Sequence, residues 1–311
     1  MDITAIGEVL IDLTQQGLDE AGIPRFAANP GGAPANLAVA AARLGASTAF
    51  IGRVGQDAFG AYLRRVLTEQ RVDISGLAAD PLEPTTLAVV MVDHTGERSF
   101  TFYRDPGADT RLSREQLPTA LLLSTRCLHF GSVSLTAEPS RDATFFAVRT
   151  AREHGAIISY DPNYRAALWP DEATAVRMMK EPLSLVDVLK VSEEELPLLT
   201  GTDDLDKGAS LLMAQGIRVV FITLGPRGAY YALRDGHGLA PGVSCTVADT
   251  NGAGDTFFGA ALSRLMRLPS LDALTLPLLR DIAAFSNRAA SITASRHGAI
   301  PAMPSLAEVE A

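Results

Sequence analysis

Short apolar runs alternate with longer helical patterns along most of this chain. Residues 126–132 and 156–163 are rich in apolar and β-forming side chains, and residues 140–155 between them have a helical pattern. The same alternation recurs on both sides of this region. Strands that alternate with single helices are typical of a parallel sheet with crossover helices, so the pattern predicts an α/β fold with a central, mostly parallel sheet flanked by helices.

Two of the expected helices have clear start and stop signals. Residues 36–44 have helical composition, Pro34 suits a first turn, and Gly45 suits the residue after a helix. A second helix is predicted after the glycine-rich stretch "NGAGD" at residues 251–255. Its apolar positions fall at helical spacing, at Phe258, Leu262, Leu265 and Met266.

One region departs from the alternation. Thr85 to Asp105 contains two β-rich runs around "DHTGE", a turn signal, and predicts an antiparallel hairpin. Such a hairpin suggests a small β-sheet that covers one end of the main domain. The segment after Asp12, as far as "NPGG", has loop-like sequence. No repeat or linker divides the chain, which is therefore expected to form a single domain over residues 1–311.

Composition and charge narrow the range of partners. The 311 residues carry a net charge of −9 and include no basic cluster, which argues against nucleic-acid binding. No apolar run approaches the ~18 residues of a membrane span. Cys127 and Cys245 have no metal-ligand spacing, and the five histidines are scattered. These features predict a cytoplasmic protein that binds neither membrane nor nucleic acid.

Common catalytic signatures are missing from the sequence. None of the three lysines follows a glycine, so there is no G-x-x-x-x-G-K-[ST] phosphate loop. The chain also lacks H-E-x-x-H, G-x-S-x-G, and a G-x-G-x-x-G after the first expected strand. The standard pyrophosphate-binding motifs are therefore not supported.

The stretch "NGAGD" offers another way to hold a phosphate. Its glycines allow several backbone N–H groups to point in one direction, and the helix that follows adds partial positive charge at its N-terminus. Asp255 at the edge of such a site would accept the proton of a hydroxyl that attacks phosphorus. The motif alone leaves a second interpretation open, because aspartate is also a common helix-capping residue.

A second polar group lies near the N-terminus. "NPGGAPAN" places Gly31 and Gly32 before the helix that carries Asn36, and Asp12 ends an expected strand. Asp and Asn side chains together suit a polyol, because each can bridge neighbouring hydroxyls. Taken singly, Asp12 could be a turn residue and Asn36 a surface residue of its helix.

Together the two motifs resemble those of the ribokinase/pfkB family of sugar kinases. The resemblance covers nearly the whole chain and is strongest to the fructokinase branch, as in "AFIGRVGQDAFG", "FYRDPGAD", "SYDPNYRAALWP", "KVSEEELPLLTG" and "TLGPRGAYY". It implies a ribokinase-like fold with a small β-sheet lid, formed by roughly residues 13–32 and 84–108. It also implies the ligands ATP, Mg²⁺ and a sugar.

The resemblance also implies roles for individual residues. Asp255 would be the catalytic base, and the amides of Gly252, Ala253 and Gly254 would form the anion hole. The sugar would be bound by residues in three parts of the chain: Asp12, Gly31, Gly32, Asn36, Phe102, Arg104 and Arg165. For Phe102 and Arg104, a place in the lid core and a surface salt bridge are the alternatives.

Nucleotide and metal positions follow from the same resemblance. The nucleotide would be bound by Ser192, Thr223, Gly225, Gly228 and Asn287. Glu195 keeps the acidic position that organises Mg²⁺ through water, whereas Ser192 departs from the usual asparagine of the family's N-x-x-E motif. Asp249 matches a region that binds a monovalent cation in some members, and a K⁺ requirement is left open.

The expected activity is ATP-dependent phosphorylation of D-fructose at its 6-hydroxyl. A 2-keto-3-deoxygluconate kinase is the nearest alternative, since it shares "FYR" and "DPNYR", and a catalytically silent sugar- or nucleotide-binding protein is the other. Family members often pair through their lids, so a homodimer is expected.

Overall fold

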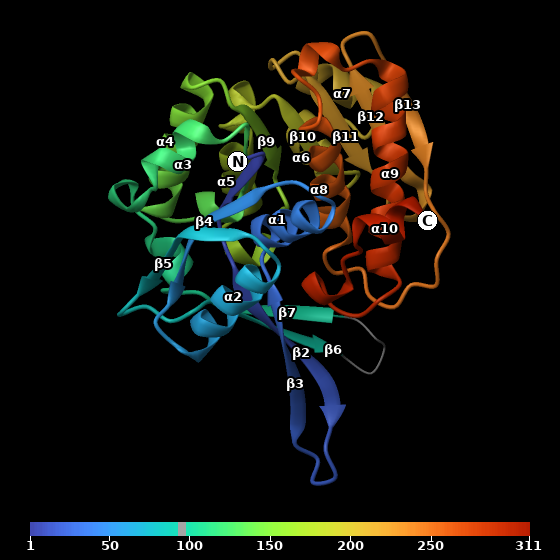
Figure 1. The fold of residues 1–311 in the computed structure, drawn as a ribbon. Helices are drawn as coiled ribbons and strands as arrows, with labels where there is room; N and C mark the ends of the chain where they lie inside the picture. Colours follow the sequence, from blue (N-terminus) through green and yellow to red (C-terminus); the bar gives the residue numbers. More distant parts are fainter. Residues whose placement is uncertain (93–97) are drawn as a thin grey trace.

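The main sheet of this computed structural model, which describes residues 1–92 and 98–311, contains nine strands in the order β13-β12-β11-β10-β9-β8-β1-β4-β5 (Figure 1). The seven strands from β11 to β5 are parallel, and β12 and β13 are antiparallel additions at one edge. The predicted mostly parallel sheet is thus confirmed. Its strands are β1 (Ile3–Ile6), β4 (Thr48–Gly55), β5 (Asp73–Asp80), β8 (Cys127–Gly131), β9 (Ile157–Asp161), β10 (Val188–Ser192), β11 (Val219–Thr223), β12 (Gly228–Leu233) and β13 (Gly236–Pro241).

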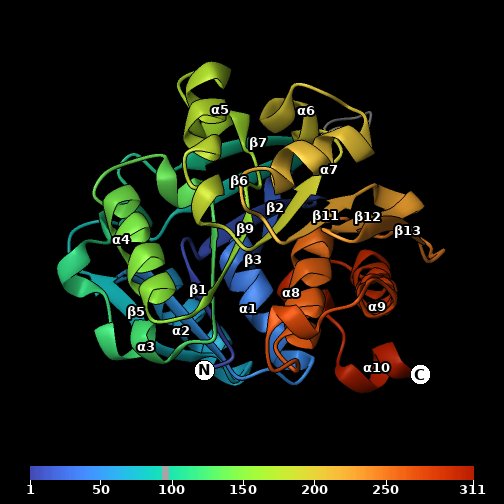
Figure 2. The same cartoon turned by 90° about the horizontal axis from the view of Figure 1, so that it is seen from above.

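Helices cover both faces of this sheet (Figure 2). One face packs against α3 (Thr119–Ser124), α4 (Ser140–Glu153), α5 (Glu172–Lys180), α6 (Glu195–Thr200) and α7 (Leu205–Met213). The other face packs against α1 (Ala33–Arg43), α2 (Ala58–Glu69), α8 (Ala253–Leu265) and α9 (Leu276–Ala294), and α10 (Leu306–Glu310) packs on α9. The helices predicted from residues 36–44 and from Phe258 to Met266 are confirmed as α1 and α8.

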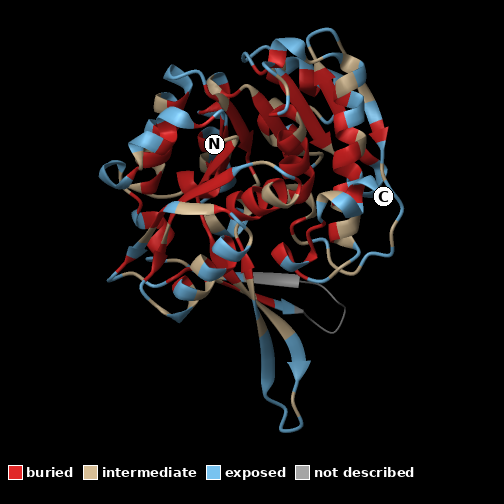
Figure 3. Cartoon of the chain, viewed as in Figure 1, coloured by how far each residue is buried: buried red, intermediate tan, exposed pale blue. Residues whose placement is uncertain are grey.

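The strands owe their buried position to apolar side chains on both faces. Successive residues of a strand point to opposite sides of the sheet. In β8, Leu128 and Phe130 join the core under α4, whereas Cys127 joins the core under α8. Both layers are buried at the central strands, as the red strands of Figure 3 show, so these strands read mainly as apolar runs and do not alternate regularly with polar residues.

A separate four-stranded sheet has the order β3-β2-β6-β7, with strands β2 (Leu10–Leu18), β3 (Pro24–Gly31), β6 (Leu87–Val92) and β7 (Arg98–Tyr103). β6 and β7 pair antiparallel, which confirms the predicted hairpin, while its "DHTGE" turn with His94 lies outside the described residues. The loop-like prediction for the segment after Asp12 was wrong, because this segment forms β2 and β3. Few residues of these two strands are buried, and their many polar positions give no apolar strand pattern in the sequence.

The chain crosses between the two sheets at residues 7–9, which separate β1 from β2. β4 and β8 lie on either side of β1, so the chain order along the sheet reverses there. In open α/β sheets, ligands bind outside the carboxyl ends of the strands at such a reversal. The small sheet lies next to this edge, which therefore is the expected place for a site.

Candidate active site

Two helix N-termini meet at the carboxyl edge of the main sheet. α1 begins after Gly32, α8 begins after Gly252, and the two helices pack against each other. Asn36 Nδ2 in the first turn of α1 donates a 2.8 Å hydrogen bond to Asp255 Oδ2 in the first turn of α8, across 219 residues of sequence. Asn36 is buried, so the surface alternative for this residue was wrong. The Asp255 carboxylate therefore accepts a hydrogen bond from another helix. It does not cap its own helix, whose N-cap is Gly252.

Asp12 approaches the same place from the small sheet. It lies in β2 opposite Asn29 of β3, and its Oδ2 accepts a 3.4 Å hydrogen bond from Asn251 Nδ2. A side chain on Gly31 would overlap the Asp12 carboxylate, which explains a glycine at this position. The predicted polar residues from the two ends of the chain are thus brought together.

These side chains surround a cavity of about 330 Å³ between the two sheets. Five of the seven residues predicted to bind the sugar line it, and so does Asp255, the predicted base. The lining consists of Glu8, Leu10, Asp12, Gly32, Ala33, Asn36, Phe102, Val133, Asn163, Arg165, Leu168, Asn251 and Asp255. Sequence reasoning missed Glu8, Asn163 and Asn251 among these, although Asn251 lies inside the quoted "NGAGD" motif.

Burial makes the two aspartates of this cavity more basic. It raises the pKa of Asp255, and the Asn36 hydrogen bond, Lys190 and Arg165 act against this rise. It also raises the pKa of Asp12 to about 6, against the hydrogen bond from Asn251. A carboxylate with a raised pKa is a better proton acceptor, so Asp255 has the character of a general base.

The glycine-rich turn lies at the start of α8. Gly252 has φ 74°, a left-handed conformation, and a Cβ there would lie 2.8 Å from that of Ala299. The first N–H groups of a helix have no acceptor within it and attract anions. Of the three amides predicted for the anion hole, that of Ala253 donates to Thr250 O at 3.3 Å. A phosphate would compete with that carbonyl.

A buried ion pair beneath this turn was missed from the sequence. Lys190 Nζ donates to Asp161 Oδ2 at 2.9 Å, and the two side chains are 8% and 4% exposed. The same ammonium lies 3.3 Å from the position of a Cβ on Gly254. A lysine inside the apolar run "VDVLKVS" was the available signal, because lysine is rarely buried without a partner.

The Arg104 guanidinium donates hydrogen bonds to three protein groups. Its Nε donates to Asp109 Oδ2 at 2.7 Å, its Nη1 to Thr136 Oγ1 at 2.7 Å, and its Nη2 to Val133 O at 3.1 Å. The side chain is 7% exposed. Arg104 lines a neighbouring hollow of about 410 Å³ and not the cavity described above, whereas Phe102 lines both.

Arg165 is the cation that lines the cavity itself. It is exposed, and its Nη1 donates to the carbonyl of Tyr164 at 3.0 Å. Asn163, two residues earlier, has φ 46°, a left-handed conformation that asparagine tolerates better than most residues. The tight turn after β9 therefore directs this loop over the cavity.

Glu195 and Ser192 bond reciprocally at the end of β10. The Ser192 N–H donates to Glu195 Oε2 at 2.8 Å, and the Glu195 N–H donates to Ser192 Oγ at 3.2 Å. Glu195 Oε1 accepts from the Tyr164 N–H at 2.7 Å, which ties it to the loop that carries Arg165. Glu195 thus holds together two loops at the carboxyl edge of the sheet.

The residues predicted to bind nucleotide lie farther along this edge. Thr223 ends β11, and Gly225 and Gly228 have φ values of 57° and 101° in the turn to β12. A Cβ on Gly228 would overlap the backbone of β13. Asn287 in α9 donates from Nδ2 to the carbonyls of Ala240 and Pro241, both at 3.0 Å, and so positions the end of β13.

Asp249 lies in the loop that leads into the glycine-rich turn. Its carboxylate accepts from the Asn251 N–H at 2.9 Å and from the Gly298 N–H at 3.2 Å. The backbone of residues 248 and 249 also donates to Ala294 O. Asp249 therefore joins the loop before α8 to the segment after α9.

Residues 1–92 and 98–311 contain neither a cluster of metal ligands nor a membrane-spanning helix. No group of three or more His, Cys, Asp or Glu side chains within these ranges is arranged to hold a metal ion. The described helices also include none that is long and apolar enough to cross a membrane.

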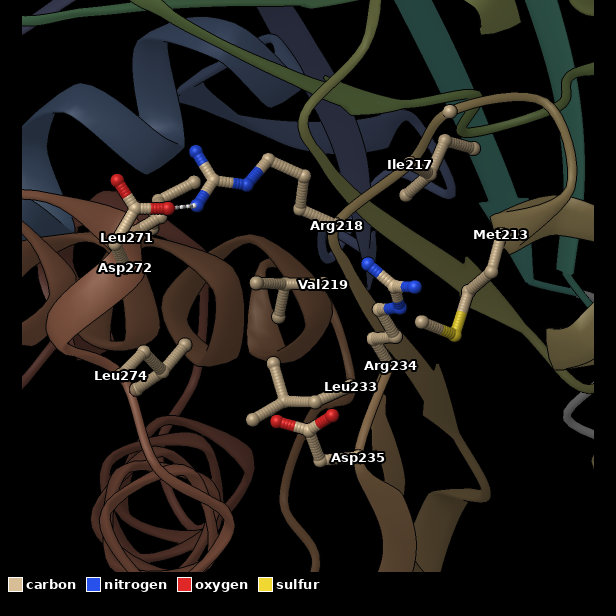
Figure 4. A pocket seen from close by; sticks show the side chains of 11 residues that line it. Met213, Ile217, Arg218, Val219, Leu233, Arg234, Asp235, Leu271, Asp272 and Leu274 are labelled. Atoms are coloured by element: carbon tan, nitrogen blue, oxygen red, sulfur yellow. Dashed lines mark hydrogen bonds and ion pairs between the residues drawn. The ribbon is translucent and has the colours of Figure 1, made fainter.

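A larger hollow of about 590 Å³ lies at the opposite edge of the sheet (Figure 4). It is formed around the start of β11, where Val219 and Leu233 provide apolar walls, and Arg218 pairs with Asp272 at its rim. It includes none of the residues predicted to act on a substrate. The smaller cavity, which six of the predicted residues line, is therefore the candidate active site.

Comparison with known proteins shows the family to which the chain belongs. Residues 1–306 match the family described as pfkB family carbohydrate kinase. Fructokinase-1 of Zea mays is 41% identical over 310 residues, which cover 99% of this chain and 96% of the relative.

Two solved structures have nearly the same fold. A fructokinase from Xylella fastidiosa with bound ATP has a TM-score of 0.92 at 34% identity and covers 99% of this chain and 97% of its own. A Vibrio cholerae fructokinase double mutant, in a fructose-, ADP- and potassium-bound form, has a TM-score of 0.89 at 35% identity and covers 100% and 97%.

The two sheets, with a buried carboxylate at a helix N-terminus between them, define a ribokinase-like sugar kinase. The chain belongs to the pfkB family of carbohydrate kinases and is a carbohydrate kinase enzyme. The predicted family and fold are thereby confirmed.

Proposed function

We propose that this chain is a fructokinase, which transfers the γ-phosphoryl group of ATP to the 6-hydroxyl of D-fructose. The hydrogen bond between Asn36 and Asp255 carries the proposal, because it fixes a basic carboxylate where the cavity meets the glycine-rich turn. The fructokinases that match nearly the full chain support ATP-dependent fructose phosphorylation in general.

In the proposed reaction, the sugar oxygen forms a bond to the γ-phosphorus as the bond from that phosphorus to the bridging oxygen of ATP breaks. Asp255 accepts the hydroxyl proton, and ADP leaves with the bridging oxygen. A positioned base typically accelerates a reaction by ~10²–10⁴-fold. The amides of Gly252, Ala253 and Gly254 stabilise the negative charge on the transferred group.

The sugar is proposed to occupy the 330 Å³ cavity. Asp12 and Asn36 accept and donate hydrogen bonds to its hydroxyls, and Gly31 and Gly32 let the backbone approach it closely. Phe102 covers one side of the sugar. Arg165, which is exposed at the cavity, approaches the transferred phosphoryl group as a bidentate donor.

The nucleotide is proposed to lie along the edge formed by Ser192, Thr223, Gly225, Gly228 and Asn287. Mg²⁺ would be held through water by Glu195, and it would neutralise charge on the phosphates. A monovalent cation would bind near Asp249, whose carboxylate already orders two backbone amides. The expected cytoplasmic location stays a prediction.

The alternative of a 2-keto-3-deoxygluconate kinase is less well supported. A sugar acid needs a cation that can meet its carboxylate. Arg104, which was expected to meet the substrate, donates to Asp109, Thr136 and Val133 O instead. The second alternative, a catalytically silent binding protein, does not explain why the buried Asp255 is kept beside the glycine-rich turn.

A panel of sugars with ATP and Mg²⁺, followed by a coupled ADP assay, tests the proposal. D-Fructose is expected to give the highest kcat/KM, and phosphate is expected on its 6-hydroxyl. Asp255→Asn should bind fructose and ATP as wild type does but lose turnover by ~10²-fold or more. A higher kcat/KM for 2-keto-3-deoxygluconate would reject the fructokinase assignment, and unchanged turnover in Asp255→Asn would remove that residue from its role.

A further inference from the structure

Two buried acceptor atoms in the sugar cavity have no partner among the described residues. They are Asn36 Oδ1 and Glu8 Oε2. An unpaired buried polar atom destabilises the fold, so it usually has a ligand or water partner. Asn36 belongs to the expected sugar site. Glu8 does not, because no motif in the sequence pointed to it.

Glu8 lies where the chain crosses from the main sheet to the small one. The residue is 3% exposed. Its Oε1 accepts a 3.1 Å hydrogen bond from the Ala33 N–H at the start of α1. The carboxyl is therefore fixed by one oxygen, and the other is buried without a partner in a residue that lines the cavity.

We propose that Glu8 is a specificity-determining residue: its second carboxyl oxygen binds a hydroxyl of a neutral ketose, and its charge disfavours a sugar acid. This inference rests on the proposed sugar kinase function and deepens it. Gly32 has no Cβ, and one would lie 2.5 Å from Glu8 O. The α1 N-terminus therefore packs directly on Glu8, so the carboxyl cannot turn away from the cavity without losing its Ala33 bond.

The charge of Glu8, and with it the discrimination, depends on pH. Burial raises its pKa to about 7, the nearby Asp109 acts in the same direction, and Arg104 acts against it. At pH 8 most Glu8 is therefore ionised. A substrate carboxylate next to it would have to enter a cavity that already holds the carboxyls of Asp12 and Asp255. A neutral ketose meets no such repulsion.

Steady-state kinetics at pH 8 on three variants tests the inference. Glu8→Ala should raise the KM for fructose about tenfold or more, because it removes a hydrogen bond to a charged group, and should change the KM for ATP less than twofold. Glu8→Gln keeps an acceptor for the Ala33 N–H and a polar group for the hydroxyl. It should keep the fructose KM within about threefold and raise kcat/KM for 2-keto-3-deoxygluconate, relative to fructose, about tenfold. Glu153→Gln, at an exposed site on α4, is the matched control.

The outcomes separate this inference from the proposed function. A wild-type enzyme that does not phosphorylate fructose rejects both. Wild-type turnover with an unchanged fructose KM in Glu8→Ala, or with an equal rise in the KM for ATP, rejects the role of Glu8 alone. If Glu8→Ala does not fold, as its melting temperature would reveal, Glu8→Gln decides. In that case, an unchanged kcat/KM for 2-keto-3-deoxygluconate relative to fructose overturns the inference.

Discussion

Lys190 interacts with three carboxyl groups, those of Asp161, Glu195 and Asp255. Burial alone would lower its pKa, but these carboxylates outweigh burial and raise it, so the ammonium stays charged. Burial raises the pKa of Asp161 to about 6 against the attraction of Lys190. Lys190 thus holds in place a group of acids that would otherwise repel one another, and it helps to keep Asp255 ionised.

Replacing Lys190 by methionine is expected to shift the acid limb of the kcat/KM profile to higher pH. Lys190 lowers the pKa of Asp255, so its loss raises that pKa further. Because Asp255 must be ionised to accept a proton, activity should fall more at pH 6 than at pH 8.5. The measurement is kcat/KM for fructose across pH 5–9.

Two further variants separate charge from folding. Lys190→Arg keeps the cation and should keep the wild-type acid limb. Lys190→Met breaks a buried pair, which typically costs about 3–5 kcal/mol, and Asp161→Asn in the same chain should restore part of that stability. An acid limb that does not move in folded Lys190→Met would show that Lys190 acts on packing and not on Asp255.

At the residue scale, the site residues that belong to recognisable sequence motifs could be predicted. Asp255, Asn36, Asp12 and Gly32 were predicted and do meet at one cavity. Glu8 and the Lys190–Asp161 pair were missed, because their importance comes from burial and from neighbours that are distant in the chain. The roles of all these residues remain predictions until variants are measured.

At the scale of elements, α1 begins with a constrained turn. Gly32 has φ 102°, and a Cβ there would lie 2.5 Å from Glu8 O and 2.9 Å from Val9 Cα. Both neighbours are backbone and cannot rotate away. The start of α1 therefore depends on glycine for conformation and for space at once.

Gly32→Ala is expected to lower the free energy of unfolding by ~2–6 kcal/mol, since left-handed strain and overpacking each cost ~1–3 kcal/mol. Gly22→Ala is the matched control, because Gly22 has φ 77° but nothing within 4 Å of the added carbon. It should lose only ~1–2 kcal/mol. Urea unfolding followed by circular dichroism measures both, and equal losses would contradict the steric argument.

Elements were predictable in proportion to their burial. β8, β9, α4 and α8 have strong apolar patterns because each is packed on the central core. The sequence predicted a loop at β2 and β3, since "DLTQQGL" and "PRFAANPG" alternate poorly and few of their side chains are buried. β2 is paired instead by backbone hydrogen bonds to β6, a strand some seventy residues later in the sequence, and no local pattern reports such a partner.

At the scale of the whole molecule, the β2–β3 hairpin projects away from the main domain (Figure 1). Its outer part is exposed and carries large apolar side chains, with Leu18 63%, Ile23 59% and Phe26 41% exposed. Apolar side chains grouped on a projecting hairpin are typical of a protein interface. They support the predicted homodimer through the small sheet, because a second copy would cover the same residues symmetrically.

Light scattering during gel filtration is expected to give about twice the chain mass of 32.9 kDa at micromolar concentration. Replacing Ile23 and Phe26 together by glutamate should place charge in the dimer interface and yield the monomer. Leu82→Glu is the control, because Leu82 is 88% exposed but lies in the loop between β5 and β6. A wild-type monomer, or a dimer that survives the double change, would reject the hairpin as the interface. Since this hairpin carries Asp12 at its base, a monomeric variant should also bind fructose more weakly than the Leu82 control does.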